Sequence, residues 1–202
     1  MRNKIILSFI LTFVLLHSPL FALFDTGTAM DKGKLELDFC VNPFDFVEYG
    51  QNYIFWHYGL GDGWETHGYA SKYGYITNWD STQTYELYSG ILKQFYSSEY
   101  LDLAASIGLR KVFVPYTNFS VFGPSLLYTF KINRTIRIAG HIMPITDVPR
   151  DGSGIGFRPL NRGYTTEIGA YFRLNEHAEI AFGAFTTTAS RTTPIYTFNW
   201  YF

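Results

Sequence analysis

The sequence predicts an all-β fold, a closed antiparallel transmembrane β-barrel of about ten strands. First, 19% of the 202 residues are aromatic, yet the mean hydropathy is close to zero at -0.01. Second, apolar and polar residues alternate in segments of roughly ten residues separated by turn residues, which is typical of strands with two different faces. Third, after the N-terminal leader no apolar run reaches the ~18 residues of a membrane-spanning helix.

The first 22 residues have the layout of a secretory signal peptide. Two basic residues among the first four precede an apolar run over residues 5–16, and small Ala22 follows it. That run is shorter than the ~20 residues a transmembrane helix needs. We therefore expect cleavage after Ala22, with Ala29 as a weaker alternative, and one domain over residues 23–202 that works outside the cytoplasm.

Charge and cysteine content exclude several classes of partner and cofactor. The formal net charge is -1, whereas a nucleic-acid surface needs a basic excess, so we expect no nucleic-acid partner. Cys40 is the single cysteine and cannot form an internal disulfide. We interpret it as a buried or lumenal residue without redox chemistry.

The alternation is clearest in the last segment, where Tyr196, Phe198, Trp200 and Phe202 share one face of a strand. We count ten such segments, of which residues 52–59 give the weakest pattern. An even number is required if both ends of the barrel domain lie on the same side of a membrane. Eight strands, with the first hairpin folded differently, remain the alternative.

The polar faces carry charges near mid-strand with small residues between them, which favours a lumen inside and lipid outside over a soluble sandwich. Positive and negative side chains on these faces are nearly equal in number. Because buried charges are tolerated only when paired, we expect ion pairs in a narrow or closed lumen. Large Tyr88 and Tyr171 should fill more of it. The side chains assigned to this lumenal network are Lys34, Glu36, Asp38, Glu86, Asp102, Arg110, Lys131, Arg137, His141, Glu167, Arg173 and Glu179.

Connection lengths predict the same topology. Tight turns at 97–99, 133–134 and 175–177 alternate with longer connections, which we place at 77–83, 115–118 and 144–162. Transmembrane barrels keep short turns on one side and long loops on the other.

A C-terminal strand with aromatic residues at alternate positions up to Phe202 resembles that of bacterial outer-membrane β-barrel proteins in general. The resemblance covers the architecture of residues 23–202 and includes no motif of a particular family. It implies a location in the outer membrane, with lipid and lipopolysaccharide as neighbours. It also implies that Tyr196, Phe198, Trp200 and Phe202 are the signal read by the barrel-assembly machinery.

Catalytic chemistry has one weak candidate. His141 is expected near a long connection that carries Asp147, Asp151 and Ser153, so a lipid-modifying site at the rim is conceivable. A lumenal polar network accounts for His141 more simply. We predict no catalytic residues.

A metal site is also weakly indicated. His57 and His67 are separated by a turn, with Asp62 and Glu65 between them, but the set lacks a recognised ligand spacing. We interpret these residues as polar turn residues. The prediction is therefore no metal and no cofactor.

These observations lead to three functional hypotheses. The first is a non-enzymatic barrel with a charged, largely filled lumen that serves membrane integrity or surface interaction through its extracellular loops. The alternative is a narrow channel for ions or small solutes, and a lipid-modifying rim enzyme ranks third.

Overall fold

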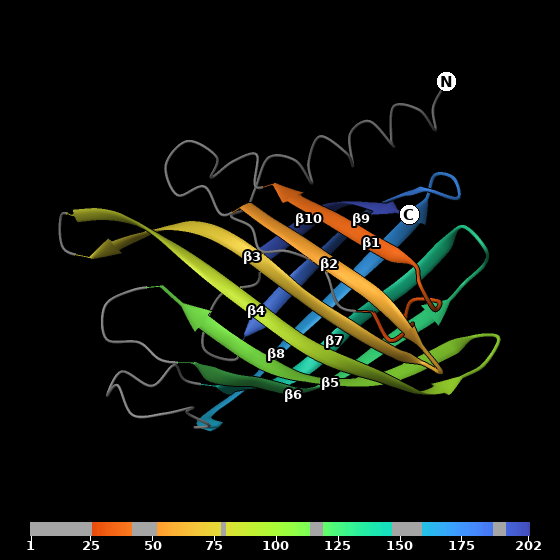
Figure 1. Cartoon of the computed structure of the whole chain (residues 1–202), viewed down its shortest axis with the longest axis horizontal. Helices are drawn as coiled ribbons and strands as arrows, with labels where there is room; N and C mark the ends of the chain where they lie inside the picture. The colour runs from red at the N-terminus through yellow and green to blue at the C-terminus, as the bar shows by residue number, and fades with distance from the viewer. Residues whose placement is uncertain (1–25, 42–51, 78–79, 114–118, 147–158, 188–192) are drawn as a thin grey trace, which may run out of the picture.

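The computed structural model describes residues 26–41, 52–77, 80–113, 119–146, 159–187 and 193–202. These residues form a closed barrel of ten antiparallel strands (Figure 1). In chain order the strands are β1 (Leu35–Val41), β2 (Asn52–Gly61), β3 (Trp64–Thr77), β4 (Asp80–Ser97), β5 (Leu101–Val112), β6 (Ser120–Lys131), β7 (Ile136–Thr146), β8 (Pro159–Arg173), β9 (Ala178–Thr187) and β10 (Thr193–Tyr201).

The barrel closes where the first strand meets the last. Every strand pairs antiparallel with its neighbours in the chain, and β1 pairs with both β2 and β10. Leu37 lies opposite Trp200 in this closing ladder. Leu35 and Phe202 exchange two backbone hydrogen bonds, of 3.3 and 2.8 Å, at its end. Closure satisfies backbone groups that an open sheet would leave at its edges.

The ten-strand barrel predicted from the sequence is confirmed, and the eight-stranded alternative is wrong. The weakly patterned residues 52–59 lie within β2, which pairs with β1 and β3 along its length. The first hairpin therefore belongs to the barrel wall.

Successive side chains point alternately into and out of the barrel, because a strand has a side-chain period of two. In β5, Asp102, Ala104 and Ser106 are buried, while Ile107 and Leu109 are exposed. The same alternation recurs in the other strands. The interior is consequently polar and the outer surface largely apolar. Among the described residues, none forms a helix long and apolar enough to cross a bilayer.

Short turns gather at one end of the barrel, which we call the short-turn end. The turn between β2 and β3 needs left-handed backbone at Gly61, Asp62 and Gly63, with φ of 99°, 52° and 71°. The Asn133 side chain accepts hydrogen bonds from the backbone N–H groups of Thr135 and Ile136, both at 2.8 Å, and so closes the β6–β7 turn.

At the opposite end, the prediction of a long connection at 77–83 is wrong. Strand β3 continues to Thr77 and pairs there with Asp80 of β4, so these residues form a long hairpin that projects beyond its neighbours (Figure 1). The expected connection at 144–162 is partly strand, because β7 reaches Thr146 and β8 begins at Pro159. The remainder, 147–158, lies outside the described residues, as do 114–118.

Closure predicts a specific cross-link between β1 and β10. The double variant Leu37→Cys/Trp200→Cys places thiols on directly opposed residues, whose Cα atoms lie about 5.5 Å apart in a hydrogen-bonded pair, within disulfide range. We expect efficient intramolecular disulfide formation in the folded protein, measured as a reductant-sensitive change in gel mobility.

The control Leu37→Cys/Phe198→Cys moves one thiol two residues along β10, where a diagonal pair is about 7–8 Å apart. We expect poor cross-linking there. Equal cross-linking of both double variants would contradict the register.

Candidate functional site: the polar lumen and the segment across its mouth

Buried polar and charged side chains line much of the barrel interior. Among the described residues they come from the inner faces of every strand except β4, which contributes the partly buried Glu86. Those buried include Glu36, Asp38, His57, Glu65, His67, Ser71, Asp102, Ser106, Ser120, Ser125, Thr129, His141, Thr165, Glu167, Glu179, Thr197 and Asn199.

The side chains that the sequence assigns to the lumen fall into three groups. Glu36, Asp38, Asp102, His141, Glu167 and Glu179 are buried. Partly buried are Glu86, Arg110, Lys131 and Arg137. Exposed at the short-turn end are Lys34 and Arg173. Arg173 lies at the end of strand β8, directly opposite inward-facing Glu179 of β9, and its guanidinium lies over the Tyr201 ring, 4.8 Å from its centroid.

One charged network spans three strands near the short-turn end. Arg137 of β7 donates to both carboxylate oxygens of Glu179 of β9, with its Nε at 3.2 Å from Oε2. The Tyr201 hydroxyl on β10 donates to Glu179 Oε1 at 2.9 Å and accepts from Arg137 at 3.1 Å. Beside it, the Asn199 amide donates to Glu36 at 3.0 Å. The guanidinium thus compensates a carboxylate that is only 1% exposed.

A second network is centred on Asp102 of β5, which is fully buried. Its Oδ1 accepts from Lys131 at 2.6 Å and from Ser97 at 2.7 Å, and its Oδ2 accepts from Thr28 at 2.6 Å. Thr28 precedes the first strand. The carboxylate therefore joins the barrel wall to the N-terminal part of the described chain.

Residues 26–33, here called the cover segment, cross the mouth of the barrel at the short-turn end (Figure 1). The segment contacts four strands in succession through hydrogen bonds: Gly27 N–H to Thr129 Oγ1 at 2.9 Å, Thr28 Oγ1 to Asp102, Ala29 N–H to Gln94 at 2.9 Å, and Met30 N–H to Glu65 at 2.8 Å. Ala29 also packs against buried Leu92, Ala104 and Leu127. These contacts hold the segment across the lumen.

Two glycines permit this close approach. A Cβ atom at Gly27 would lie 2.7 Å from the Asp102 carbonyl oxygen and 2.8 Å from the Tyr128 Cα. One at Gly59 of β2 would collide with the backbone oxygens of Met30 and Asp31. Gly59 instead accepts from Gly33 at 2.9 Å and donates to Lys34 at 3.0 Å, which fixes the end of the cover segment on β2.

Aromatic rings fill the lumen further from the short-turn end. Tyr53, Phe55, Tyr69, Tyr88 and Phe122 form a contiguous cluster with ring centroids 5.0 to 6.5 Å apart. Buried Cys40 belongs to the same cluster. Beyond this cluster, Arg110 Nε lies 3.6 Å from Glu86 Oε1, and the Arg110 guanidinium carbon lies 4.8 Å from the Phe122 ring centroid. The cross-section is therefore occupied by side chains in this half of the barrel as well.

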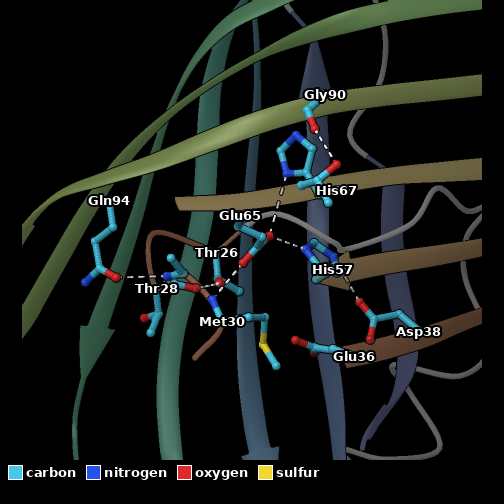
Figure 2. A network of polar contacts seen from close by, with 12 residues as sticks. Thr26, Thr28, Met30, Glu36, Asp38, His57, Glu65, His67, Gly90 and Gln94 are labelled. Atoms are coloured by element: carbon cyan, nitrogen blue, oxygen red, sulfur yellow. Dashed lines mark hydrogen bonds and ion pairs between the residues drawn. The ribbon is translucent and has the colours of Figure 1, made fainter. Parts of the chain in front are cut away.

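His57, Glu65 and His67 lie between the cover segment, which contacts Glu65, and the aromatic cluster, whose Tyr88 contacts His67. Figure 2 shows the three side chains beside Met30 of the cover segment. His57 and His67 are directly opposed on β2 and β3, and Glu65 is two residues from His67 on the same face. His57 Nδ1 is 2.7 Å from Glu65 Oε1, and His67 Nδ1 is 3.8 Å from it. The interpretation of these side chains as turn residues is wrong, since all three are buried in the lumen.

The catalytic hypothesis is only partly described by the structure. His141 is buried on β7, and its Nδ1 lies 3.9 Å from Glu167 Oε2. Asp147, Asp151 and Ser153 lie outside the described residues.

The aromatic residues of the C-terminal strand lie on the outer face: Phe198, Trp200 and Phe202 are exposed and Tyr196 is partly buried.

Two open cavities of about 440 and 370 Å³ adjoin the cover segment at the short-turn end. Both are lined by Thr28, Arg137 and Arg173. The first also contacts Lys131 and Glu179, and the second contacts Glu36. The charged networks described above thus form the walls of a water-accessible mouth.

Comparison with known proteins gives no family. No protein-family model and no curated protein matches the chain. Among the solved structures that match is one described as "Asymmetric conductivity of engineered proteins", with 10% identity and a TM-score of 0.32 over 75% of this chain. The chain spans about half of that protein, 55% of its length. A TM-score of this size carries no argument about function.

The Arg137–Glu179 pair predicts a strongly non-additive mutational response. Arg137→Ala should destabilise the barrel by roughly 3 to 5 kcal/mol, because it leaves the buried Glu179 carboxylate without its guanidinium. Adding Glu179→Gln should recover at least about half of that loss, since the uncompensated charge is removed. Urea unfolding titrations of the refolded protein measure both values.

Arg134→Ala, in the exposed β6–β7 turn, is the matched control and should change the free energy of unfolding by less than about 0.5 kcal/mol. Equal effects of Arg137→Ala and Arg134→Ala would show that the buried pair contributes nothing to stability.

Proposed function

We propose that this chain is a non-enzymatic outer-membrane β-barrel whose lumen is closed to solutes, and that it serves membrane integrity or surface contacts through the loops opposite the short turns. The observation that carries the proposal is the cover segment, hydrogen-bonded across a lumen already filled by side chains.

The outer surface supports a membrane location. Aliphatic side chains stand exposed around its middle, including Ile54, Leu87, Ile91, Ile107, Leu109, Leu126, Ile142 and Ile168. Exposed aromatic residues lie toward the short-turn end at Tyr58, Trp64, Tyr96 and Tyr100, and toward the other end at Tyr85, Phe113, Phe119 and Tyr164. An apolar band between aromatic girdles is typical of transmembrane barrels.

In water the same surface would be costly. Soluble monomers rarely expose contiguous apolar patches larger than a few hundred Å², whereas here exposed apolar residues recur on strand after strand. Hydrocarbon removes that cost, and because β1 pairs with β10 the described sheet has no first or last strand with a free edge along its whole length. Lipid and lipopolysaccharide are accordingly the proposed neighbours of the outer face.

The lumen supports a closed state. Oppositely charged side chains pair inside it, as in the 2.6 Å contact between Lys131 Nζ and Asp102 Oδ1. These charges compensate each other and so do not need mobile ions as partners. A barrel of ten strands is also narrow, because interiors of about eight strands are filled by side chains alone. Among the described residues, open cavities adjoin the lumen beside the cover segment, at the short-turn end.

The two mouth cavities favour a second candidate, a narrow channel that opens when the cover segment moves. They already bring water to Arg137 and Glu179 from the short-turn end. Passage would still require the aromatic cluster around Tyr88 to rearrange. The closed barrel therefore ranks first.

A charge on the outer face should oppose membrane insertion. Ile91, 49% exposed midway between the aromatic girdles, becomes lipid-facing in the proposed orientation. Ile91→Arg should destabilise the barrel in lipid vesicles by about 2 to 4 kcal/mol. Glu99→Arg, in the exposed β4–β5 turn, is the control and should be nearly neutral. If the two variants fold into vesicles equally well, the outer face does not lie in lipid.

Single-channel recording tests the closed lumen. Wild-type protein in planar bilayers should show no discrete current steps. Gly27→Val should produce only brief openings, because its side chain cannot fit against the Asp102 carbonyl and displaces the cover segment, while the aromatic cluster around Tyr88 must still rearrange before ions pass. Thr26→Val, which places the same residue at the neighbouring position with almost no change in side-chain volume, should stay closed. Steady conductance of the wild type would favour the channel hypothesis instead.

A further inference from the structure

We propose that His57, Glu65 and His67 form a binding site for a divalent transition-metal ion of the Zn²⁺ type, inside the barrel directly beneath the cover segment. This inference goes beyond the closed-barrel function, which does not require a metal. It rests on the placement of the three ligands, on the groups that hold their other polar atoms, and on the local charge.

The three side chains present a compact set of ligand atoms. One ligand atom from each residue can be chosen so that all three lie within 4.8 Å of one another. Ligand atoms about 2.0 to 2.2 Å from a tetrahedral zinc ion are about 3.4 Å apart. The observed Glu65 Oε1 distances of 2.7 Å to His57 Nδ1 and 3.8 Å to His67 Nδ1 bracket that value. Small side-chain rotations therefore suffice to bind an ion.

Each ligand residue is also oriented by a second group. His57 turns its other nitrogen, Nε2, toward Asp38 Oδ2 at 3.5 Å, and His67 Nε2 lies 2.9 Å from the Tyr88 hydroxyl. Protein metal sites commonly fix their histidines in this way, through a carboxylate or another polar group on the far nitrogen.

Glu65 is held in the same manner. Its Oε2 accepts the Met30 N–H of the cover segment, while its Oε1 points between the two histidines (Figure 2). The ligand set is therefore preorganised by β1, β4 and the cover segment, which contribute Asp38, Tyr88 and Met30.

The local chemistry selects the class of ion. Two imidazoles and one carboxylate suit zinc and neighbouring first-row metals, whereas Mg²⁺ and Ca²⁺ prefer sets of oxygen ligands alone. The carboxylates of Asp38 and Glu65 are both nearly fully buried, at 1% and 2% exposure, so a dication would offset charge that is otherwise costly to bury. Three protein ligands leave the fourth tetrahedral position for water.

The site should bind one Zn²⁺ per chain. Full-length barrel, refolded in detergent and stripped of metal with a chelator, is titrated with ZnCl₂ by calorimetry. We expect 1:1 binding, at least tenfold weaker binding for Glu65→Gln and for His67→Gln, and unchanged binding for His141→Gln. His141 is a matched control, since it is a buried inner-face histidine on β7 that lies beside Glu167 of β8.

A second readout is thermal unfolding, in which Zn²⁺ should raise the midpoint of wild type and His141→Gln but not of the two site variants. No Zn²⁺ binding by the folded wild type tighter than about 1 mM would overturn the proposal. An equal loss of Zn²⁺ affinity in His141→Gln and His67→Gln would also overturn the proposal. If Glu65→Gln fails to fold, comparison of Zn²⁺ binding by the wild type and by His67→Gln still tests the proposal. Conductance is not a readout here, so this result and that of the closed-lumen test are independent.

Discussion

Pairing of β1 with β10 is the constraint on which the rest of the structure depends. Once Leu35 and Phe202 exchange their backbone hydrogen bonds, the sheet has an inside, and alternate residues of every strand must lie there. The sequence places acids, bases, histidines and hydroxyls at those positions, and each must be satisfied by another part of the same interior. Closure thereby turns a simple alternation into a dense polar network.

The cover segment extends that network beyond the strands. It uses backbone N–H groups of Gly27, Ala29 and Met30 and the Thr28 hydroxyl to satisfy side chains on β6, β5, β4 and β3. The same contacts hold the segment across the mouth and orient Glu65 toward the two histidines. The proposed closure and the proposed metal site are thus two consequences of one arrangement, in which a short extended segment completes the hydrogen bonding of buried polar groups.

Most of the fold was predictable because period-two alternation is a local property. It predicted the number of strands and most of the inward-facing charges, including Arg137 and Glu179. Two features were missed for physical reasons. Hairpin pairing of β3 and β4 continues through residues that looked like a connection, because polar strand ends outside an apolar band need no alternation. The cover segment has no strand pattern, since three of its four hydrogen bonds to strand side chains use backbone N–H groups.

The histidine pair could have been found. The turn at Asp62 makes residues 57 and 67 symmetric about it, so their direct opposition and the shared face of Glu65 follow from a tight hairpin. Spacing along the chain does not identify such a site, because ligands on two paired strands are brought together by the register of the strands and not by their sequence separation.

Accessibility of Cys40 tests the central claim, that the lumen is closed by its own side chains, most directly. Cys40 is 2% exposed on the inner face of β1, within the aromatic cluster, and is the single cysteine of the chain. A small, charged thiol reagent is applied to the barrel reconstituted in lipid vesicles, and adducts are counted by mass spectrometry. A closed lumen predicts negligible labelling of the folded protein and complete labelling after unfolding. Rapid labelling of the folded barrel would contradict the account, because it would require a water-filled path to the middle of the lumen.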